Sequence, residues 1–288
     1  MPVVLLVSLV VIITAVTINT RLRLRLDIAR GIQAHSRSRL LARSTLNEVI
    51  FNLMTGIYTS TGVRFSNQNG VQTVWNLYNE PISPAPEIEI RLQDCAGLLS
   101  PLFPSAALER LAASRAKAGS LVPHLRELLQ DWQDSDDLKH LQGAEAFDYR
   151  MAGYPYTPRN FFLQTLDEIE LLKGFPPDLY PRLRPDLVYW PARHINCMTM
   201  SPELLEAWFG NRELAARLVS LRRSGRLTPT MFSALTGISS DFRISFAPSS
   251  RIRVTIRTVV QKAVDKLTVV IVKKDSNKRP FLLTSWQE

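Results

Sequence analysis

The first apolar segment of the chain runs from Pro2 to Thr20 without a charged residue. At about 1.5 Å of rise per residue, a helix of this length is roughly 28 Å long, which matches the hydrocarbon core of a bilayer. A cleaved signal peptide needs basic residues before the apolar segment and a small-residue cleavage site after it, and this segment has neither. The pattern predicts a retained single-span anchor, with a buried core helix as the alternative.

Helical periodicity continues beyond the anchor. Apolar residues recur at spacings of three and four, namely Leu46, Val49, Ile50, Leu53, Met54 and Ile57. Such a stripe is typical of a helix with one buried face. Together with residues 21–45, it predicts a single helix from the membrane to about residue 58, whose distal half packs on a folded domain.

The periodicity changes after residue 60. The stretches 71–79 and 87–95 alternate or are rich in β-formers, and the sequence EPISPAPE joins them, which predicts an antiparallel hairpin. Strand patterns return at residues 242–248, 251–263 and 266–274, which predicts a hairpin or a three-stranded meander.

Residues 100–240 are helical in pattern, with proline and glycine between the helices. The clearest helical segments are SAALERLAAS, LVPHLRELLQDW, TLDEIELLKG, SPELLEAWFG and NRELAARLVSLRRSG. The order of strands, helical block and strands indicates an α+β fold, in which a large all-α insertion interrupts an antiparallel sheet. The predicted parts are the anchor (1–20), the rest of the long helix (21–60), the first sheet part (61–98), the insertion (99–240) and the C-terminal strands (241–288).

Composition indicates a folded globular chain, with 45% hydrophobic and 21% charged residues. The net charge of +9 favours an acidic partner or surface. Much of this charge follows the apolar segment directly, where an anionic bilayer would attract it, so it does not specifically favour nucleic acid. The charge after the apolar segment is carried by seven arginines, namely Arg21, Arg23, Arg25, Arg30, Arg37, Arg39 and Arg43. By the positive-inside rule, these arginines hold the following domain in the cytoplasm.

Acidic residues cluster in the stretch LLQDWQDSDDLKHLQGAEAFDYR, residues 128–150. Glu145 stands at the twelfth position counted from Asp134, as the bidentate ligand of an EF-hand loop does. Leu138 and Lys139, however, occupy the positions of a ligand and of the required glycine, so an EF-hand is excluded.

Hard carboxylate oxygens in this number suit calcium. The candidate ligands are Asp134, Asp136 and Glu145, with Asp131 and Asp148 as weaker candidates. From the residues alone, a solvated acidic turn that caps a helix is an equally good interpretation.

Nothing in the sequence predicts catalysis. The four histidines are scattered, and His140, although it lies beside the acidic residues, lacks the spacing of a zinc site. No Ser-His-Asp order and no glycine-rich phosphate loop occur. We therefore expect a bound ion to be structural and to tie a long loop to the helical block.

An ordered set of motifs resembles the general secretion pathway protein K family, the large minor pseudopilin of type II secretion systems. The matching run is LQDWQDSDDLKHLQGAEAFDY, followed by GYPYTPRNFFLQTLDEIELLKGFPPDLYPRLRPDLVYWPARHINCMTMSPELL. EIRLQDCAGLLS and SSDFRISF are weaker matches on either side. Two details depart from the family pattern: Asn196 is followed by Cys197 instead of a further asparagine, and no asparagine follows DCAG.

The resemblance implies a pilin-type helix and a pilin-like sheet, structural calcium in the insertion, and minor pseudopilins I and J as partners. It also implies a periplasmic body, which conflicts with the arginines; a basic leader before PVVLL, missing here, would resolve the conflict. The family shares the absence of an early glutamate in the apolar helix, and here Asp27 is the first acidic residue. That absence is expected of the first subunit of a filament.

A membrane-anchored DNA-binding protein is the rival prediction, because LDEIELLKGFPPDLYPRLRPDL resembles a helix-hairpin-helix unit. The prolines of its turn remove amide donors that a phosphate needs, which disfavours this function. Cys95 and Cys197 lie at the borders of the insertion, and either a disulfide or two buried thiols fits the sequence.

Overall fold

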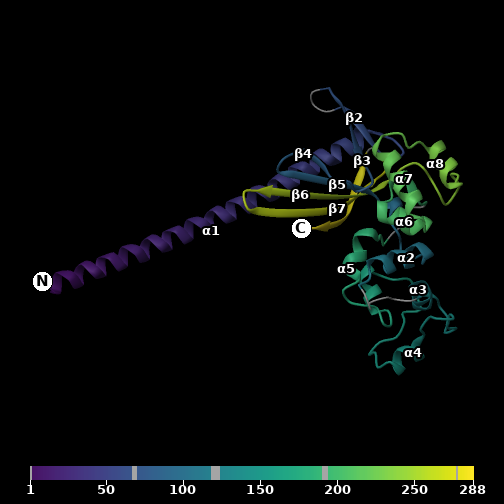
Figure 1. The fold of residues 1–288 in the computed structure, drawn as a ribbon, viewed down its shortest axis with the longest axis horizontal. Coiled ribbons are helices and arrows are strands. Elements are labelled where there is room, and N and C mark those ends of the chain that lie inside the picture. The colour runs from purple at the N-terminus through teal and green to yellow at the C-terminus, as the bar shows by residue number, and fades with distance from the viewer. Residues whose placement is uncertain (1, 67–69, 118–123, 190–193, 277) are drawn as a thin grey trace.

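The computed structural model describes residues 2–66, 70–117, 124–189, 194–276 and 278–288. Helix α1 runs without interruption from Pro2 to Thr55, which confirms the predicted long helix. Its N-terminal part projects from the molecule and its C-terminal part lies along a sheet (Figure 1). Among the described residues, α1 is the one helix long and apolar enough to span a membrane, with a mean hydropathy of 1.6 in its apolar window.

The distal half of α1 packs on the sheet through one stripe. Its buried members include Ala34, Ser38, Ala42, Thr45, Leu46, Val49 and Leu53. The predicted stripe is therefore correct for most of its length, but Ile57 is 70% exposed. The helix ends before this residue because Gly56 turns the chain: a Cβ there would lie 2.4 Å from Val63 Cγ1 and 2.6 Å from the Asn52 carbonyl oxygen.

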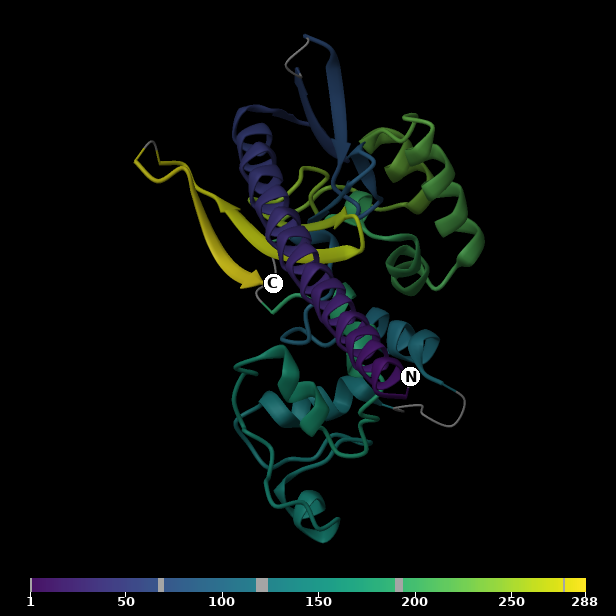
Figure 2. The same ribbon diagram turned by 90° about the vertical axis from the view of Figure 1, so that its left-hand side faces the viewer.

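Two antiparallel sheets follow. The order β1–β2–β3 joins β1 (Ile57–Tyr58), β2 (Gly62–Ser66) and β3 (Gln72–Asn76). The order β4–β5–β6–β7–β8 joins β4 (Ile82–Ala85), β5 (Ile88–Asp94), β6 (Arg251–Val260), β7 (Ala263–Lys273) and β8 (Phe281–Gln287). Figure 2 shows α1 crossing the second sheet over β6 and β7. The insertion separates β5 from β6 in sequence, yet these strands pair, so the predicted α+β fold with an interrupted sheet is confirmed.

The predicted pairing of residues 71–79 with 87–95 is confirmed only at residues 77–79, where the Asn79 amide donates to the Leu92 carbonyl and the Asp94 amide to the Leu77 carbonyl. β3 itself pairs with β2 along its length. Beyond the end of β3, Tyr78 forms an isolated bridge with Gln93 of β5. The proline-rich stretch forms β4 at the sheet edge, with a register irregularity between Ile82 and Ala85. An edge position tolerates a proline, because the missing amide is not needed by a further strand.

The predicted C-terminal hairpin is confirmed as β6 and β7, whose pairing extends from Arg251–Val272 to Val260–Ala263. The predicted strand at residues 242–248 is wrong. There, the Asp241 side chain accepts hydrogen bonds from the amides of Arg243 and Ile244, which makes a turn with one bridge residue. The third strand of the meander is β8 instead.

The insertion has its own hydrophobic core, separate from the core between α1 and the sheets. Its α-helices are α2 (Ala106–Arg115), α3 (Leu125–Gln133), α4 (Ala146–Met151), α5 (Tyr180–Leu183), α6 (Pro202–Phe209), α7 (Arg212–Arg223) and α8 (Pro229–Thr236). The described residues also form the 3-10 turns η1 (Cys95–Gly97), η2 (Leu166–Leu171), η3 (Arg184–Asp186) and η4 (Cys197–Thr199).

The predicted helices correspond to these elements with one difference in type. TLDEIELLKG forms the 3-10 turn η2 and not an α-helix, with the Glu168 carboxylate accepting hydrogen bonds from the amides of Gln164 and Thr165 at its start. The first three residues of LVPHLRELLQDW and residues 190–193 of the family-like run lie outside the described residues.

Asp94 joins the insertion to the sheet. Its Oδ1 accepts hydrogen bonds from the amides of Ala96 and Ser249 and from the Ser249 hydroxyl, and its Oδ2 accepts from Asn196 Nδ2 and Thr199 Oγ1. The carboxylate thus fixes both ends of the insertion at one point. Cys95 and Cys197 are free and buried, and burial raises the pKa of their thiols to about 11 and about 12.

Candidate metal centre

The acid cluster begins on the last turn of α3. This helix buries Leu125, Leu128, Leu129 and Trp132 on one face, and Asp131 lies on the same face with 0% exposure. Asp134 ends the helix in an extended conformation. Carboxylates at a helix C-terminus meet the negative end of the helix dipole, so this position destabilises both of them unless a cation is near.

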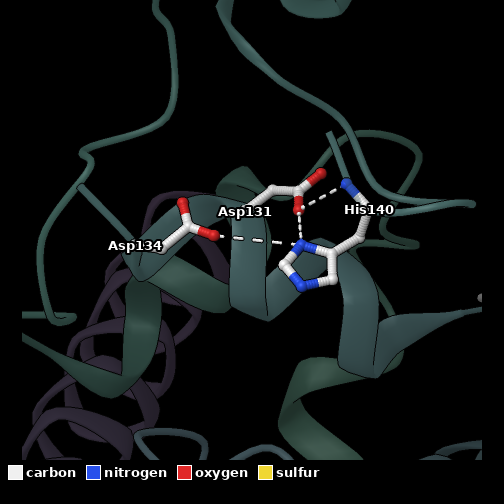
Figure 3. Close-up of side chains that lie close together, drawn as sticks. All are labelled: Asp131, Asp134 and His140. Atoms are coloured by element: carbon white, nitrogen blue, oxygen red, sulfur yellow. Dashed lines mark hydrogen bonds and ion pairs between the residues drawn. The ribbon is translucent and has the colours of Figure 1, made fainter. Parts of the chain in front are cut away.

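Three side chains converge beyond the end of α3 (Figure 3). Asp131, Asp134 and His140 each place one possible ligand atom within 4.8 Å of the others. Asp131 Oδ1 contacts His140 Nδ1 and accepts a hydrogen bond of 3.1 Å from the His140 amide. The imidazole Nδ1 also lies 3.8 Å from Asp134 Oδ2. One histidine thus faces two aspartates.

Several buried oxygen atoms at this end of α3 have no hydrogen-bond partner among the described residues. They are Asp131 Oδ2, Asp134 Oδ1, both Oε atoms of Glu145, and Asn160 Oδ1. Buried polar atoms in folded proteins are nearly always paired, and an unpaired one costs about 1–3 kcal/mol. A group of unpaired acceptors, all of them oxygen, is the environment that a cation completes.

The electrostatics of Glu145 show the same deficit. Burial, and then the negative charges of Asp131, Asp134, Asp137 and Asp136, raise the pKa of Glu145 to about 7. Burial also raises the pKa of Asp134, and the charges of Asp136 and Asp131 add to this. Burial and the neighbouring negative charges thus both disfavour the ionised forms of Glu145 and Asp134.

Gly143 lets the loop close over the cluster. A Cβ at this position would lie 1.9 Å from Asp131 Oδ2, so no side chain fits between the backbone and the carboxylate. The Gly-Ala-Glu sequence thus brings Glu145 back to the end of α3, at the N-cap of α4.

The structure separates the five candidate ligands into two groups. Asp131, Asp134 and Glu145 carry the unpaired oxygens. Asp136 shapes the loop, because its Oδ1 accepts a 2.8 Å hydrogen bond from the Leu138 amide. Asp148 already contacts two lysines and the Glu145 amide.

Asp148 Oδ1 lies 2.7 Å from Lys139 Nζ and 3.8 Å from Lys173 Nζ, and its Oδ2 accepts from the Glu145 amide at 3.1 Å. Its hydrogen bond with Lys139 lowers the pKa of Asp148. Asp148 thus positions Glu145 through the amide of that residue, and the carboxylate oxygens without a partner among the described residues lie on Asp131, Asp134 and Glu145.

Two residues of the site were not among the predicted ligands. His140 was set aside because a single imidazole lacks zinc spacing, yet it bridges Asp131 and Asp134. Asn160 returns to α3 from far along the chain: its amide donates to the Trp132 carbonyl at 3.1 Å, and its Nδ2 contacts Asp137 Oδ1 at 3.3 Å. Its positive φ of 52° indicates a tight turn. The Pro-Arg-Asn sequence that ends at Asn160 was the available signal of this turn.

The helix-hairpin turn offers no amides to a phosphate. The Lys173 amide donates to the Tyr149 hydroxyl, the Gly174 amide to the Tyr154 hydroxyl, and the Phe175 amide to the Leu172 carbonyl. Phosphate binding at such a turn needs free amides. The turn is therefore a packing unit between η2 and α5, and no contact in it favours DNA binding.

The family model described as "Type II secretion system (T2SS), protein K" matches residues 101–192. The matched segment contains α2 to α5 and the acid cluster, and it overlaps the run in which the sequence resembles the protein K family. A search of curated proteins finds no match. Among solved structures, one chain in the crystal structure of the GspK-GspI-GspJ complex from the type 2 secretion system of enterotoxigenic Escherichia coli is similar. It is 17% identical, covers 93% of this chain and 98% of that chain, and has a TM-score of 0.48.

Proposed function

We propose that this chain is a minor pseudopilin of a type II secretion system, a structural subunit and not an enzyme. The match of residues 101–192 to protein K of these systems carries the proposal. The architecture supports it, because α1 continues from an apolar segment into a helix that packs on an antiparallel sheet. In this interpretation, α1 anchors the chain in the inner membrane as a single span, and the body lies in the periplasm.

The subunit occupies the tip of the filament and initiates its assembly with minor pseudopilins I and J. The first acidic residue of α1 is Asp27, so the apolar segment of residues 2–20 presents no carboxylate to a preceding subunit. The insertion between β5 and β6 adds bulk that is compatible with an end position, where no further subunit stacks.

Assembly tests this proposal. The purified chain is expected to form a stoichiometric complex with pseudopilins I and J and to stay monomeric alone. Cross-linking in cells should find it once per filament, and a regular spacing along the shaft would contradict the tip position. A reporter fused after Glu288 should be active in the periplasm, whereas activity only in the cytoplasm would exclude the proposed topology.

Calcium completes the acid cluster in this proposal. The carboxylates of Asp131, Asp134 and Glu145 fit the ion, because their unpaired oxygens are hard ligands of the kind that calcium prefers. Asp136 holds the loop, and His140 orients Asp131. The ion supplies positive charge at the C-terminus of α3 and ties the loop of residues 134–145 to the helix.

The test of the calcium site is thermal unfolding with calcium and with a chelator. A ligand that binds the folded state stabilises it by about 2.7 kcal/mol at a hundredfold excess over Kd. We expect the wild-type Tm to rise with calcium and the Asp134→Ala, Glu145→Ala double variant to lose most of this rise. Glu213→Ala, an exposed acid on α7, is the control and should keep it. An equal rise in the double variant would show that the ligands are assigned wrongly.

A further inference from the structure

Large apolar side chains are exposed around the acid cluster. Their exposed fractions run from 53% to 91%, and we call them the apolar rim: Leu138, Leu141, Phe147, Met151, Phe161 and Phe162. They lie in residues 138–162, the stretch of the insertion that includes α4 (Figure 1). Single exposed apolar residues are common on soluble proteins, whereas six large ones within one stretch of 25 residues point to an interaction surface.

The acid cluster positions the first segment of the apolar rim. The Leu138 amide donates to Asp136 Oδ1 at 2.8 Å. Between Leu138 and Leu141, the His140 amide donates to Asp131 Oδ1 at 3.1 Å. The backbone that presents both leucines is thus held by two carboxylates of the cluster.

The other two segments are attached to the same cluster. Phe147 is the second residue of α4, directly after the helix N-cap at Glu145. Phe161 and Phe162 follow Asn160, whose Nδ2 contacts Asp137 Oδ1 at 3.3 Å and the Asp136 carbonyl at 3.4 Å. A cation that draws the carboxylates together therefore fixes all three segments relative to one another.

The local charge selects the kind of partner. Residues 131–151 contain six carboxylates and two basic side chains, an excess of four negative charges in a chain whose net charge is +9. One divalent cation halves this excess and leaves the region acidic. An anionic lipid surface is repelled by such a region, whereas a protein with basic residues beside an apolar face is attracted.

We propose that the apolar rim is a docking surface for a protein partner whose apolar face is flanked by lysine or arginine, and that a divalent cation in the acid cluster orders this surface. The inference rests on the metal centre proposed above and adds its purpose. The phenylalanines, with few rotatable bonds, insert into the partner, and the remaining carboxylates contact its basic flank. The bound cation presents the three segments in one arrangement, which lowers the entropy lost on binding.

The experiment uses the full chain in phosphatidylcholine nanodiscs and a labelled amphipathic helical peptide of leucine and lysine. A leucine–glutamate peptide with the same apolar face is the charge control, and empty discs provide the blank. Fluorescence anisotropy with calcium should show binding of the lysine peptide. Chelator should weaken it at least about tenfold, the factor that corresponds to 1.4 kcal/mol.

Variants locate the surface. Phe161→Ser, Phe162→Ser should weaken binding of the lysine peptide at least about tenfold. Phe51→Ser is a matched control on α1, since Phe51 is 65% exposed and Phe161 is 63% exposed, and it should leave binding unchanged. The proposed docking surface is overturned if the double variant binds the lysine peptide as tightly as wild type does. It is also overturned if wild type binds the lysine and glutamate peptides equally. Stronger calcium-dependent binding to phosphatidylglycerol vesicles than to the peptide overturns the assignment to a protein partner.

Calcium-dependent Tm separates this inference from the proposed metal site. The Phe161→Ser, Phe162→Ser variant should keep the full calcium-induced rise in Tm while its binding of the lysine peptide is weakened. If the wild-type Tm rises with calcium but the chain binds the peptide equally well in calcium and in chelator, the proposed metal site stands. The proposal that the bound cation controls docking is then overturned. A Tm without any calcium response overturns the metal site itself.

Discussion

Asp94 and Asp131 are both buried to 0% exposure, but the protein treats them in opposite ways. At the junction of sheet and insertion, both oxygens of Asp94 accept hydrogen bonds from neutral donors. At the far end of α3, Asp131 Oδ2 has no partner among the described residues. The same side chain at the same burial is thus complete in one region and incomplete in the other.

Their places on helices differ in the same sense. Asp94 is the N-cap of η1 and accepts from the Ala96 amide, where a negative charge is favourable. Asp131 lies in the last turn of α3, where a negative charge is unfavourable. A buried carboxylate whose two oxygens both have donors is a structural joint, whereas one in the last turn of a helix with one oxygen left unpaired is compatible with a site for a cation.

Exchange of each aspartate for asparagine gives the largest contrast. Asp94→Asn places an amide group against donors that need an acceptor, so we expect a loss of about 3 kcal/mol in the free energy of unfolding, with or without calcium. Asp131→Asn keeps an acceptor for the His140 amide and removes a repelling charge. Without calcium, this variant should be as stable as wild type or about 1 kcal/mol more stable.

Urea unfolding in chelator and in calcium measures both effects. Asp94→Asn should keep the stabilisation by calcium, and Asp131→Asn should lose it. If Asp131→Asn is as destabilising as Asp94→Asn in chelator, the two carboxylates are both structural joints and the comparison fails.

The pH dependence of stability offers a second contrast, of moderate size. The pKa of Glu145 is raised from 4.5 to about 7, so the folded chain holds a proton that the unfolded chain releases. Without calcium, stability should therefore fall as pH rises from about 4.5 through about 7, by on the order of 2 kcal/mol. Below pH 4.5 both states are protonated, and this contribution is flat.

Glu145→Gln isolates the effect, because glutamine does not titrate. The difference in unfolding free energy between wild type and Glu145→Gln should change over this pH window in chelator. Saturating calcium should flatten it, since a bound cation keeps the carboxylate ionised. A difference that is constant with pH in chelator would show that the folded chain does not raise the pKa of Glu145.

Local patterns in the sequence predicted much of the fold. The apolar stripe through Leu46, Val49 and Leu53 specified the packed half of α1, and the alternation in residues 251–273 specified β6 and β7. The errors concern choices between distant partners. Residues 72–76 pair with β2 and not with β5, and local periodicity does not encode which edge a strand joins.

The candidate site shows the same limit. The spacing of Asp134 and Glu145 was readable, but the importance of Asp131 depends on its burial by the packing of α3. The closeness of Gly143 to Asp131, and the return of Asn160 to the end of α3, are tertiary contacts. A sequence pattern thus identified the chemistry, while the choice of ligands required the fold.

The smallest expected effect separates a positioning residue from a ligand inside the acid cluster. Lys139→Ala removes the 2.7 Å contact with Asp148 Oδ1, but Lys173 Nζ stays 3.8 Å from the same oxygen. Lys139 is about half exposed, so the loss in unfolding free energy should be below about 1 kcal/mol. The calcium-induced rise in Tm should stay as in wild type, because Asp148 acts through its hydrogen bond to the Glu145 amide. A calcium-induced rise in Tm that is larger in Lys139→Ala than in wild type would show that Asp148, freed from Lys139, binds the ion. Asp148 would then be a ligand like Asp131, and not a fully hydrogen-bonded carboxylate like Asp94.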